Sequence, residues 1–182
     1  HFKEALNDGF NEDDLYFSIG ANLLALNRVD DAVAYFKTLF KKNPHHATAL
    51  NHLGYTLVDL NRNVDELKWG TSLVDTALSI EPDNVAFMDS KGWALYRAGK
   101  YEEALTVMDS VESRAANVPG MLTADTTVYA HLAAICEALH LNDRAIVYYK
   151  KMILIMPKDV SLKKRLDRKS TRLNSSHSRA SR

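Results

Sequence analysis

Ser90 to Leu105 read SKGWALYRAGKYEEAL. One glycine, Gly92, lies inside a segment that otherwise has a helical pattern, and a second, Gly99, follows seven residues later. A glycine in a helix interior costs about 1 kcal/mol relative to alanine, so Gly92 predicts that a neighbouring backbone approaches closely. Gly99 lies where the helix should end, in the left-handed position that glycine readily adopts. The stretch therefore predicts a helix, a tight turn and a second helix.

The same spacing recurs with a period of 34 residues. Counted from Asp13, Val85 and Thr126, an apolar or aromatic residue stands at position 4, a small one at position 8 and another apolar one at position 11. A unit that begins at Ala47 fits if four residues are inserted near 61–67, which makes it 38 residues long. Because positions 4, 8 and 11 share one helix face, that face should pack against a second helix. The residues at position 8 are Gly20, Gly54, Gly92 and Ala133.

This pattern resembles the tetratricopeptide repeat, and the amino-acid sequence is similar to those of bacterial multi-repeat members of that family. Lys91 departs from the apolar residue expected at position 7, and Pro119 comes three places late. The resemblance implies an all-α fold, a right-handed α-solenoid of antiparallel helix pairs. The implied boundaries are the end of a preceding repeat (1–12), four repeats (13–46, 47–84, 85–118 and 126–159), a linker (119–125) and the start of a next or capping helix (160–166).

Residues 167–182 differ from the rest of the chain in composition. They read DRKSTRLNSSHSRASR, with five basic residues and no apolar period, a pattern typical of a disordered tail. Asp167 to His177 also resembles the codon-for-codon translation of a common sequencing-library adapter. We therefore interpret 167–182 as an adapter-derived, disordered segment. Without it the chain carries more acidic than basic residues, so the tail supports no interaction with nucleic acid.

Side chains suited to catalysis or metal binding are scattered over the repeats. No two histidines have the i, i+4 spacing of a helical zinc site. Cys136 occupies the apolar position 11 of its unit, so we expect a buried and inert thiol. Phosphate-binding glycine loops and nucleophile elbows are absent from the sequence. We therefore expect no enzymatic activity, no cofactor and no metal.

Charge and hydropathy exclude two further classes of partner. Lysines cluster at 37–42 and at 150–151, but acidic stretches separate the clusters, so no continuous basic stripe could follow a phosphate backbone. No apolar run approaches the roughly 18 residues that span a bilayer.

The single cysteine bears on the compartment of the protein. Cys136 has no partner for an internal disulfide, which excludes a disulfide scaffold and is compatible with the cytoplasm or the envelope of a bacterium.

The resemblance implies that the first helices line a concave groove with positions 2, 5, 9 and 12. Aromatic side chains stand at several of these positions, where solubility alone would favour charge. One alternative is that Trp93 packs only between neighbouring first helices. The basic clamp with which some family members hold a peptide carboxylate is not expected, because only Asn51 and Arg97 could contribute to it. The predicted groove residues are Phe17, Asn51, Tyr55, Asp89, Trp93, Tyr96 and Arg97.

From these observations we expect a non-catalytic scaffold that binds a protein or peptide segment in the concave groove. The alternative from another class is the recognition arm of a larger enzyme, for example a glycosyltransferase or an envelope-biogenesis factor, with its catalytic domain outside this chain. A purely structural spacer is a third interpretation. The chain starts in mid-pattern at His1, so we expect a fragment with any localisation signal upstream.

Overall fold

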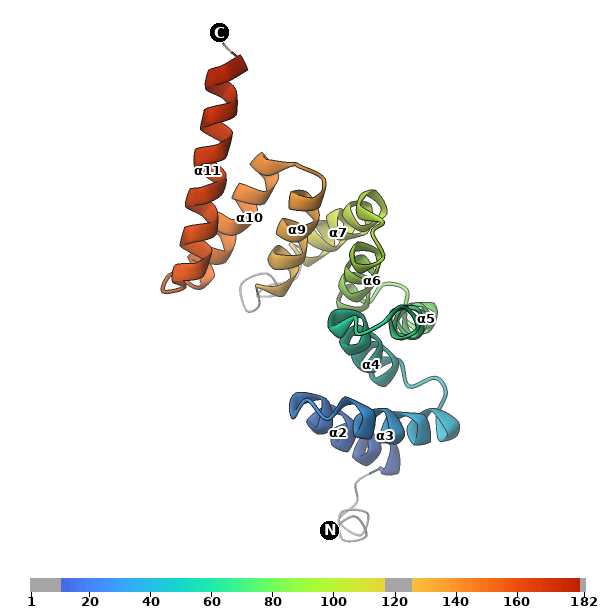
Figure 1. Cartoon of the computed structure of the whole chain (residues 1–182). Helices are drawn as coiled ribbons and strands as arrows, with labels where there is room; N and C mark the ends of the chain where they lie inside the picture. The colour runs from blue at the N-terminus through green and yellow to red at the C-terminus, as the bar shows by residue number, and fades with distance from the viewer. Residues whose placement is uncertain (1–10, 117–125, 181–182) are drawn as a thin grey trace. The chain divides into compact units, whose positions relative to one another are not determined.

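The computed structural model describes residues 11–116 and 126–180, the last nine of these by their backbone alone (Figure 1). Within these ranges every regular element is an α-helix and no strand occurs. The chain divides into two compact units, His1–Arg97 and Ala98–Arg182. The predicted all-α class is confirmed. The predicted end of a preceding repeat and the linker at 119–125 lie almost entirely outside the described residues.

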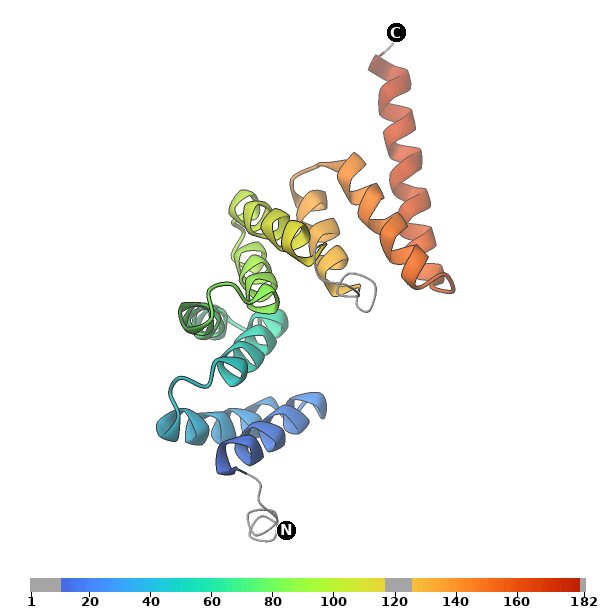
Figure 2. The ribbon, with the colours of Figure 1, turned by 180° about the vertical axis from the view of Figure 1, so that it is seen from behind.

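The first unit is a series of helices that pack as pairs. Helix α2 packs against α3, α4 packs against α5, and α6 lies on both members of the second pair, as both views of the ribbon show (Figures 1 and 2). Tight turns join the members of each pair, so they run antiparallel. The helices in the described part of this unit are α2 (Glu12–Ala25), α3 (Val29–Lys42), α4 (Ala47–Leu60), α5 (Val64–Ile80) and α6 (Val85–Arg97).

Two glycines allow α4 and α5 to approach each other. A Cβ atom added to Gly54 would lie 2.8 Å from the carbonyl oxygen of Gly70, and one added to Gly70 would lie 2.8 Å from the carbonyl oxygen of Gly54. Either substitution therefore forces the two backbones apart. This contact confirms the predicted role of the small residue at position 8. The inserted residues lengthen α5 to 17 residues, against 14 in α3.

The turns that end the first helices share one backbone conformation. Among the described residues, positive φ angles occur at Asn27 (58°), Asn61 (45°), Gly99 (78°) and His140 (59°). Counted from the start of its predicted unit, each of these residues stands at position 15. Left-handed backbone at one fixed position is a conformational repeat that supports the register inferred from the side-chain pattern. The predicted left-handed conformation of Gly99 is confirmed.

Asparagine side chains cap several helices of the first unit. The Asn11 side chain accepts a hydrogen bond from the backbone N–H of Asp13, and that of Asn63 accepts one from Glu66. Asn84 accepts from the backbone N–H groups of Ala86 and Phe87 at the start of α6. These bonds satisfy amides that lack a partner within the helix.

The second unit repeats the paired arrangement. Helix α9 packs against α10, α10 also packs against α11, and α7 packs against α9 (Figures 1 and 2). The small residue at position 8 of this unit, Ala133, is buried, as predicted, and so is Cys136. The helices described in this unit are α7 (Tyr101–Ala115), α9 (Thr127–Ala138), α10 (Asn142–Ile155) and α11 (Val160–Ala180).

The structure differs from the prediction at the end of the chain. The sequence predicts disorder from Asp167, whereas α11 continues to Ala180. The Asp159 side chain caps this helix by accepting from the backbone N–H of Ser161 and Leu162, and no glycine or proline interrupts 160–180. A nucleated helix therefore propagates without a break. The tail also makes a contact, because Lys169 Nζ lies 3.2 Å from a carboxylate oxygen of Glu137.

Candidate functional site

The predicted groove residues all lie in the first unit, on the first helices of its repeats, α2, α4 and α6. The structure brings four of them together on one helix and places the others on two preceding helices. Phe17 lies on α2, Asn51 and Tyr55 lie on α4, and Asp89, Trp93, Tyr96 and Arg97 lie on α6.

Three of the side chains on α6 form a stack. The rings of Trp93 and Tyr96 are nearly parallel, with centroids 4.7 Å apart and an interplanar angle of 16°. The Arg97 guanidinium carbon lies 5.7 Å from the Trp93 ring centroid, within the range of a cation–π interaction. All three side chains are half-buried. We call this arrangement the Trp93 platform.

A residue on the preceding first helix holds the platform in place. The indole Nε1 of Trp93 donates a hydrogen bond to Oδ1 of Asp59 on α4, over 3.0 Å. Trp93 therefore does bridge neighbouring first helices, as the packing alternative predicts, but it remains half-buried while doing so. Sequence reasoning missed Asp59. No signal in the repeat pattern singles it out, because Asp59 stands at position 13 of its unit whereas Trp93 stands at position 9 of the next.

Phe17 belongs to a different aromatic cluster. Its ring lies 6.3 Å from that of Phe36, 5.5 Å from His46 and 5.8 Å from His52, measured between centroids. Phe36 is fully buried in the core, so the cluster joins α2, α3 and α4. Burial lowers the pKa of His52 below its usual value. Phe17 thus contributes to packing between helices and lies apart from the Trp93 platform.

The polar groove residues are more enclosed than a ligand contact requires. Asp89 is only 8% exposed. The side-chain oxygen Oδ1 of Asn51 is buried without a hydrogen-bond partner among the described residues. Tyr55 is half-buried on the same helix as Asn51. Of the polar residues predicted to orient a ligand, Arg97 is the one in the described part that combines partial exposure with a position in the platform.

Groups able to perform covalent or metal chemistry do not converge in the described ranges. No cluster of three or more His, Cys, Asp or Glu side chains there could hold a metal ion. Cys136 is buried, and burial raises the pKa of its thiol, which keeps it protonated and unreactive. Among the described helices, none is long and apolar enough to cross a membrane.

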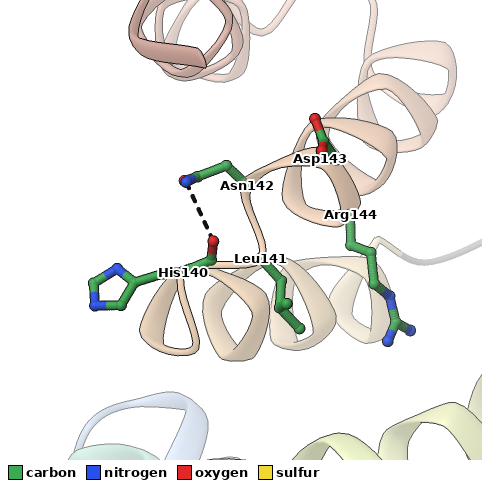
Figure 3. Close-up of a pocket in the computed structure, with 5 residues that line it drawn as sticks. All are labelled: His140, Leu141, Asn142, Asp143 and Arg144. Atoms are coloured by element: carbon green, nitrogen blue, oxygen red, sulfur yellow. Dashed lines mark hydrogen bonds between the residues drawn. The ribbon is translucent and has the colours of Figure 1, made fainter. Parts of the chain in front are cut away.

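A depression beside the turn between α9 and α10 is lined by consecutive residues (Figure 3). The Asn142 side-chain amide donates to the His140 carbonyl oxygen over 3.3 Å, which closes the turn on itself. Arg144 projects away from this bond, and its guanidinium pairs with Asp109 on α7. The depression therefore follows from the shape of the turn and offers no convergent set of functional groups.

Aromatic residues of α10 are used inside the second unit. The hydroxyl of Tyr148 donates to Glu112 on α7 over 2.8 Å, and burial raises its pKa to about 12. The hydroxyl of Tyr149 donates to Glu137 on α9 over 2.9 Å, and burial followed by this bond also raises its pKa. Lys151 Nζ completes the first pair at 2.5 Å from Glu112. These groups are satisfied by one another and form structural bridges.

Comparison with known proteins finds similarity to one repeat family. Residues 18–79 match the tetratricopeptide repeat family. Over 105 residues the chain is 33% identical to the TPR repeat-containing protein PA4667 of Pseudomonas aeruginosa. That match includes 56% of this chain and 17% of the relative, so the chain spans a small part of the relative's length.

Solved structures with low sequence identity share the fold. A thermophilic TPR protein of Thermus thermophilus, TTC0263, superimposes with a TM-score of 0.71 at 19% identity, covering 93% of this chain and 87% of that one. MamA of Desulfovibrio magneticus RS-1 gives 0.70 at 19%, covering 94% and 91%. PilF of Pseudomonas aeruginosa gives 0.73 at 16%, covering 90% and 69%. The predicted class, an α-solenoid of helix pairs, is thereby confirmed.

Proposed function

We propose that this tetratricopeptide repeat protein binds a peptide segment of a partner protein at the Trp93 platform of its first unit. Its fold is typical of protein–protein interaction scaffolds, and the members of the family with this structure are generally non-catalytic. The proposal goes further than the fold because it assigns the contact to particular side chains on α6 and α4. It assigns the chain no reaction of its own.

The observation that carries the proposal is the order of the platform. Trp93 is stacked on Tyr96 and hydrogen-bonded to Asp59, so its ring has one orientation before any ligand arrives. A preorganised aromatic side chain loses little conformational entropy on binding. Tryptophan, tyrosine and arginine are also the side chains that most often dominate the energy of protein interfaces.

Charged groups of both signs lie at the platform. They can orient a bound peptide, but they do not select strongly for a peptide of one net charge. The exposed carboxylate of Asp59 lies on one helix and the Arg97 guanidinium lies on the next. A peptide backbone can donate to the carboxylate and accept from the guanidinium. Asp89 is buried, so we assign it a supporting role within α6 rather than direct contact with the peptide.

A displayed library of random peptides tests this proposal. The library is selected on the wild-type chain, and the dissociation constants of the selected peptides are measured for wild type and for Trp93→Ala. Loss of a central aromatic anchor is worth about 2 kcal/mol, so the affinity should fall about thirtyfold.

The matched control is Tyr35→Ala, which removes a half-buried ring of α3 that belongs neither to the Trp93 platform nor to another proposed contact. Circular dichroism establishes that both variants fold. Selected peptides that bind Trp93→Ala as tightly as wild type would remove the platform from the binding site. Equal losses in both variants would point to a general effect on the unit.

A further inference from the structure

A second surface of the first unit combines aromatic rings with positive charge. Lys37, Phe40 and Lys41 project from α3 and Trp69 projects from α5, and together they line a pocket of about 590 Å³. Helices α3 and α5 are the second members of their pairs, whereas the Trp93 platform lies on the first helix α6. We call this surface the α3–α5 pocket.

The apolar walls of the pocket are anchored in the core. The Phe40 ring stacks on Phe36, with centroids 6.0 Å apart and an interplanar angle of 27°, and Phe36 is fully buried. Trp69 also packs against the same hydrophobic core while remaining half-buried. Both rings are therefore held in position by the fold. A ligand side chain that entered between them would bury apolar area without first having to order the walls.

The charges of the pocket have no internal counterpart. Lys37 Nζ lies 5.4 Å from the Trp69 ring centroid, and neither Lys37 nor Lys41 pairs with an acidic side chain among the described residues. The next lysine on the same helix, Lys42, is neutralised by Glu12. Two exposed ammonium groups thus flank an aromatic pocket and remain available to a carboxylate.

From this arrangement we propose that the α3–α5 pocket is a second binding site, which takes an acidic peptide segment that carries an aromatic or large apolar side chain between two carboxylates. The apolar side chain would lie between Phe40 and Trp69, and the carboxylates would pair with Lys37 and Lys41. A nucleic acid fits less well, because the start of α5 carries Asp65, one turn before Trp69, which would repel a continuing phosphate backbone.

The two tryptophans allow a direct test by nuclear magnetic resonance. Each indole N–H gives its own cross-peak, and Trp69→Phe and Trp93→Phe assign the two peaks. The probe is a pentapeptide of sequence Gly-Glu-Phe-Glu-Gly blocked at both ends. We expect the Trp69 peak to shift saturably while the Trp93 peak moves little. The matched peptides replace both glutamates by glutamine or the phenylalanine by alanine, and each should bind at least about fivefold more weakly.

Charge variants of the protein complete the test. Lys37→Gln together with Lys41→Gln should weaken binding about tenfold, while Lys42→Gln, on the same helix, should leave it unchanged. An unmoved Trp69 peak, equal shifts with the glutamine peptide or equal binding by the double variant would overturn the proposal. A stronger shift with a short oligothymidine would overturn it in favour of nucleic acid. Because this test depends on Trp69 and the peptide selection depends on Trp93, either site can fail alone.

Discussion

The two units use their aromatic side chains in different ways. In the first unit Trp93 and Tyr96 stack on each other and remain half-buried at the surface. In the second unit Tyr148 and Tyr149 are 3% and 1% exposed, and their hydroxyls donate to carboxylates of neighbouring helices. Rings that are enclosed and hydrogen-bonded in this way contribute to folding, whereas rings ordered at the surface are available to a partner. Aromatic content by itself therefore does not mark a binding face.

The largest expected effect separates these two roles. Tyr149→Ala removes a buried ring and should destabilise the second unit by about 3–5 kcal/mol. Trp93→Ala removes a half-buried ring and one hydrogen bond, and should destabilise the first unit by about 1–2 kcal/mol. Urea unfolding followed by circular dichroism measures both. The conservative control Tyr149→Phe loses only the hydroxyl bond, worth about 1 kcal/mol. A loss of stability in Trp93→Ala as large as that in Tyr149→Ala would contradict the different roles of the two rings.

A substitution at a helix contact tests what holds the first unit together. In Gly54→Ala the new Cβ meets the carbonyl oxygen of Gly70, so we expect a loss of about 2 kcal/mol in that unit. Both tryptophans lie in residues 1–97, so their fluorescence follows this unit during urea unfolding. The control is Ala133→Gly, at the corresponding position of the second unit, which should leave the fluorescence transition in place. An unchanged midpoint for Gly54→Ala would contradict the close approach.

Acid should weaken the two units in different pH ranges. Burial lowers the pKa of His52, so the unfolded state binds its proton more readily, and the first unit should lose stability as pH falls below about 6.5. One proton limits the slope to about 1.4 kcal/mol per pH unit. Burial alone would raise the pKa of Glu112, but hydrogen bonds from Lys151 and Tyr148 lower it overall. Its contribution to the second unit is present above the unfolded pKa near 4.5 and is lost below it.

Urea midpoints between pH 8 and pH 4 measure this difference. Replacing His52 by leucine should remove the pH dependence of the tryptophan transition between pH 7 and pH 5.5. Replacing the exposed His45 by glutamine should retain it. Identical pH profiles for His52→Leu and wild type would show that His52 is not the responsible group.

The smallest effects concern the turns at position 15. Gly99→Ala places a side chain at a φ of 78° and should cost about 1 kcal/mol, although the added Cβ meets no other atom within 4 Å. His140→Gly relieves the same left-handed conformation and should stabilise the second unit by about 0.5 kcal/mol. Thermal unfolding measures both changes. Melting temperatures that move in the same direction in both variants would contradict the view that the left-handed backbone conformation determines both changes.

Periodicity predicted the helices and their contacts because it reflects packing that every repeat must satisfy. The small residue at position 8 had to be a glycine at Gly54, where two backbones meet, and alanine suffices at Ala133. Gly99 was predictable for the same local reason. Helix α11 was not, because its continuation depends on a capped start at Asp159 and on the absence of a helix breaker, and neither leaves an apolar period.

The candidate site was predictable only in part. The spacing of Trp93, Tyr96 and Arg97 places them on one side of α6, and the structure brings them together. Asp59 escaped notice because an exposed carboxylate has no periodic signature, and its partner is determined by how two helices cross. Phe17 went to a different cluster for the same reason, since histidines of α4 reach its ring.

Chemical-shift mapping with a selected peptide tests most directly whether the surface aromatics of the first unit, rather than the enclosed aromatics of the second, bind the partner. Backbone amide and indole resonances are followed while the peptide is added to the wild-type chain. We expect the largest shifts on α4 and α6, at Asp59, Trp93, Tyr96 and Arg97. Shifts concentrated on α9 and α10, with the Trp93 indole unmoved, would contradict it.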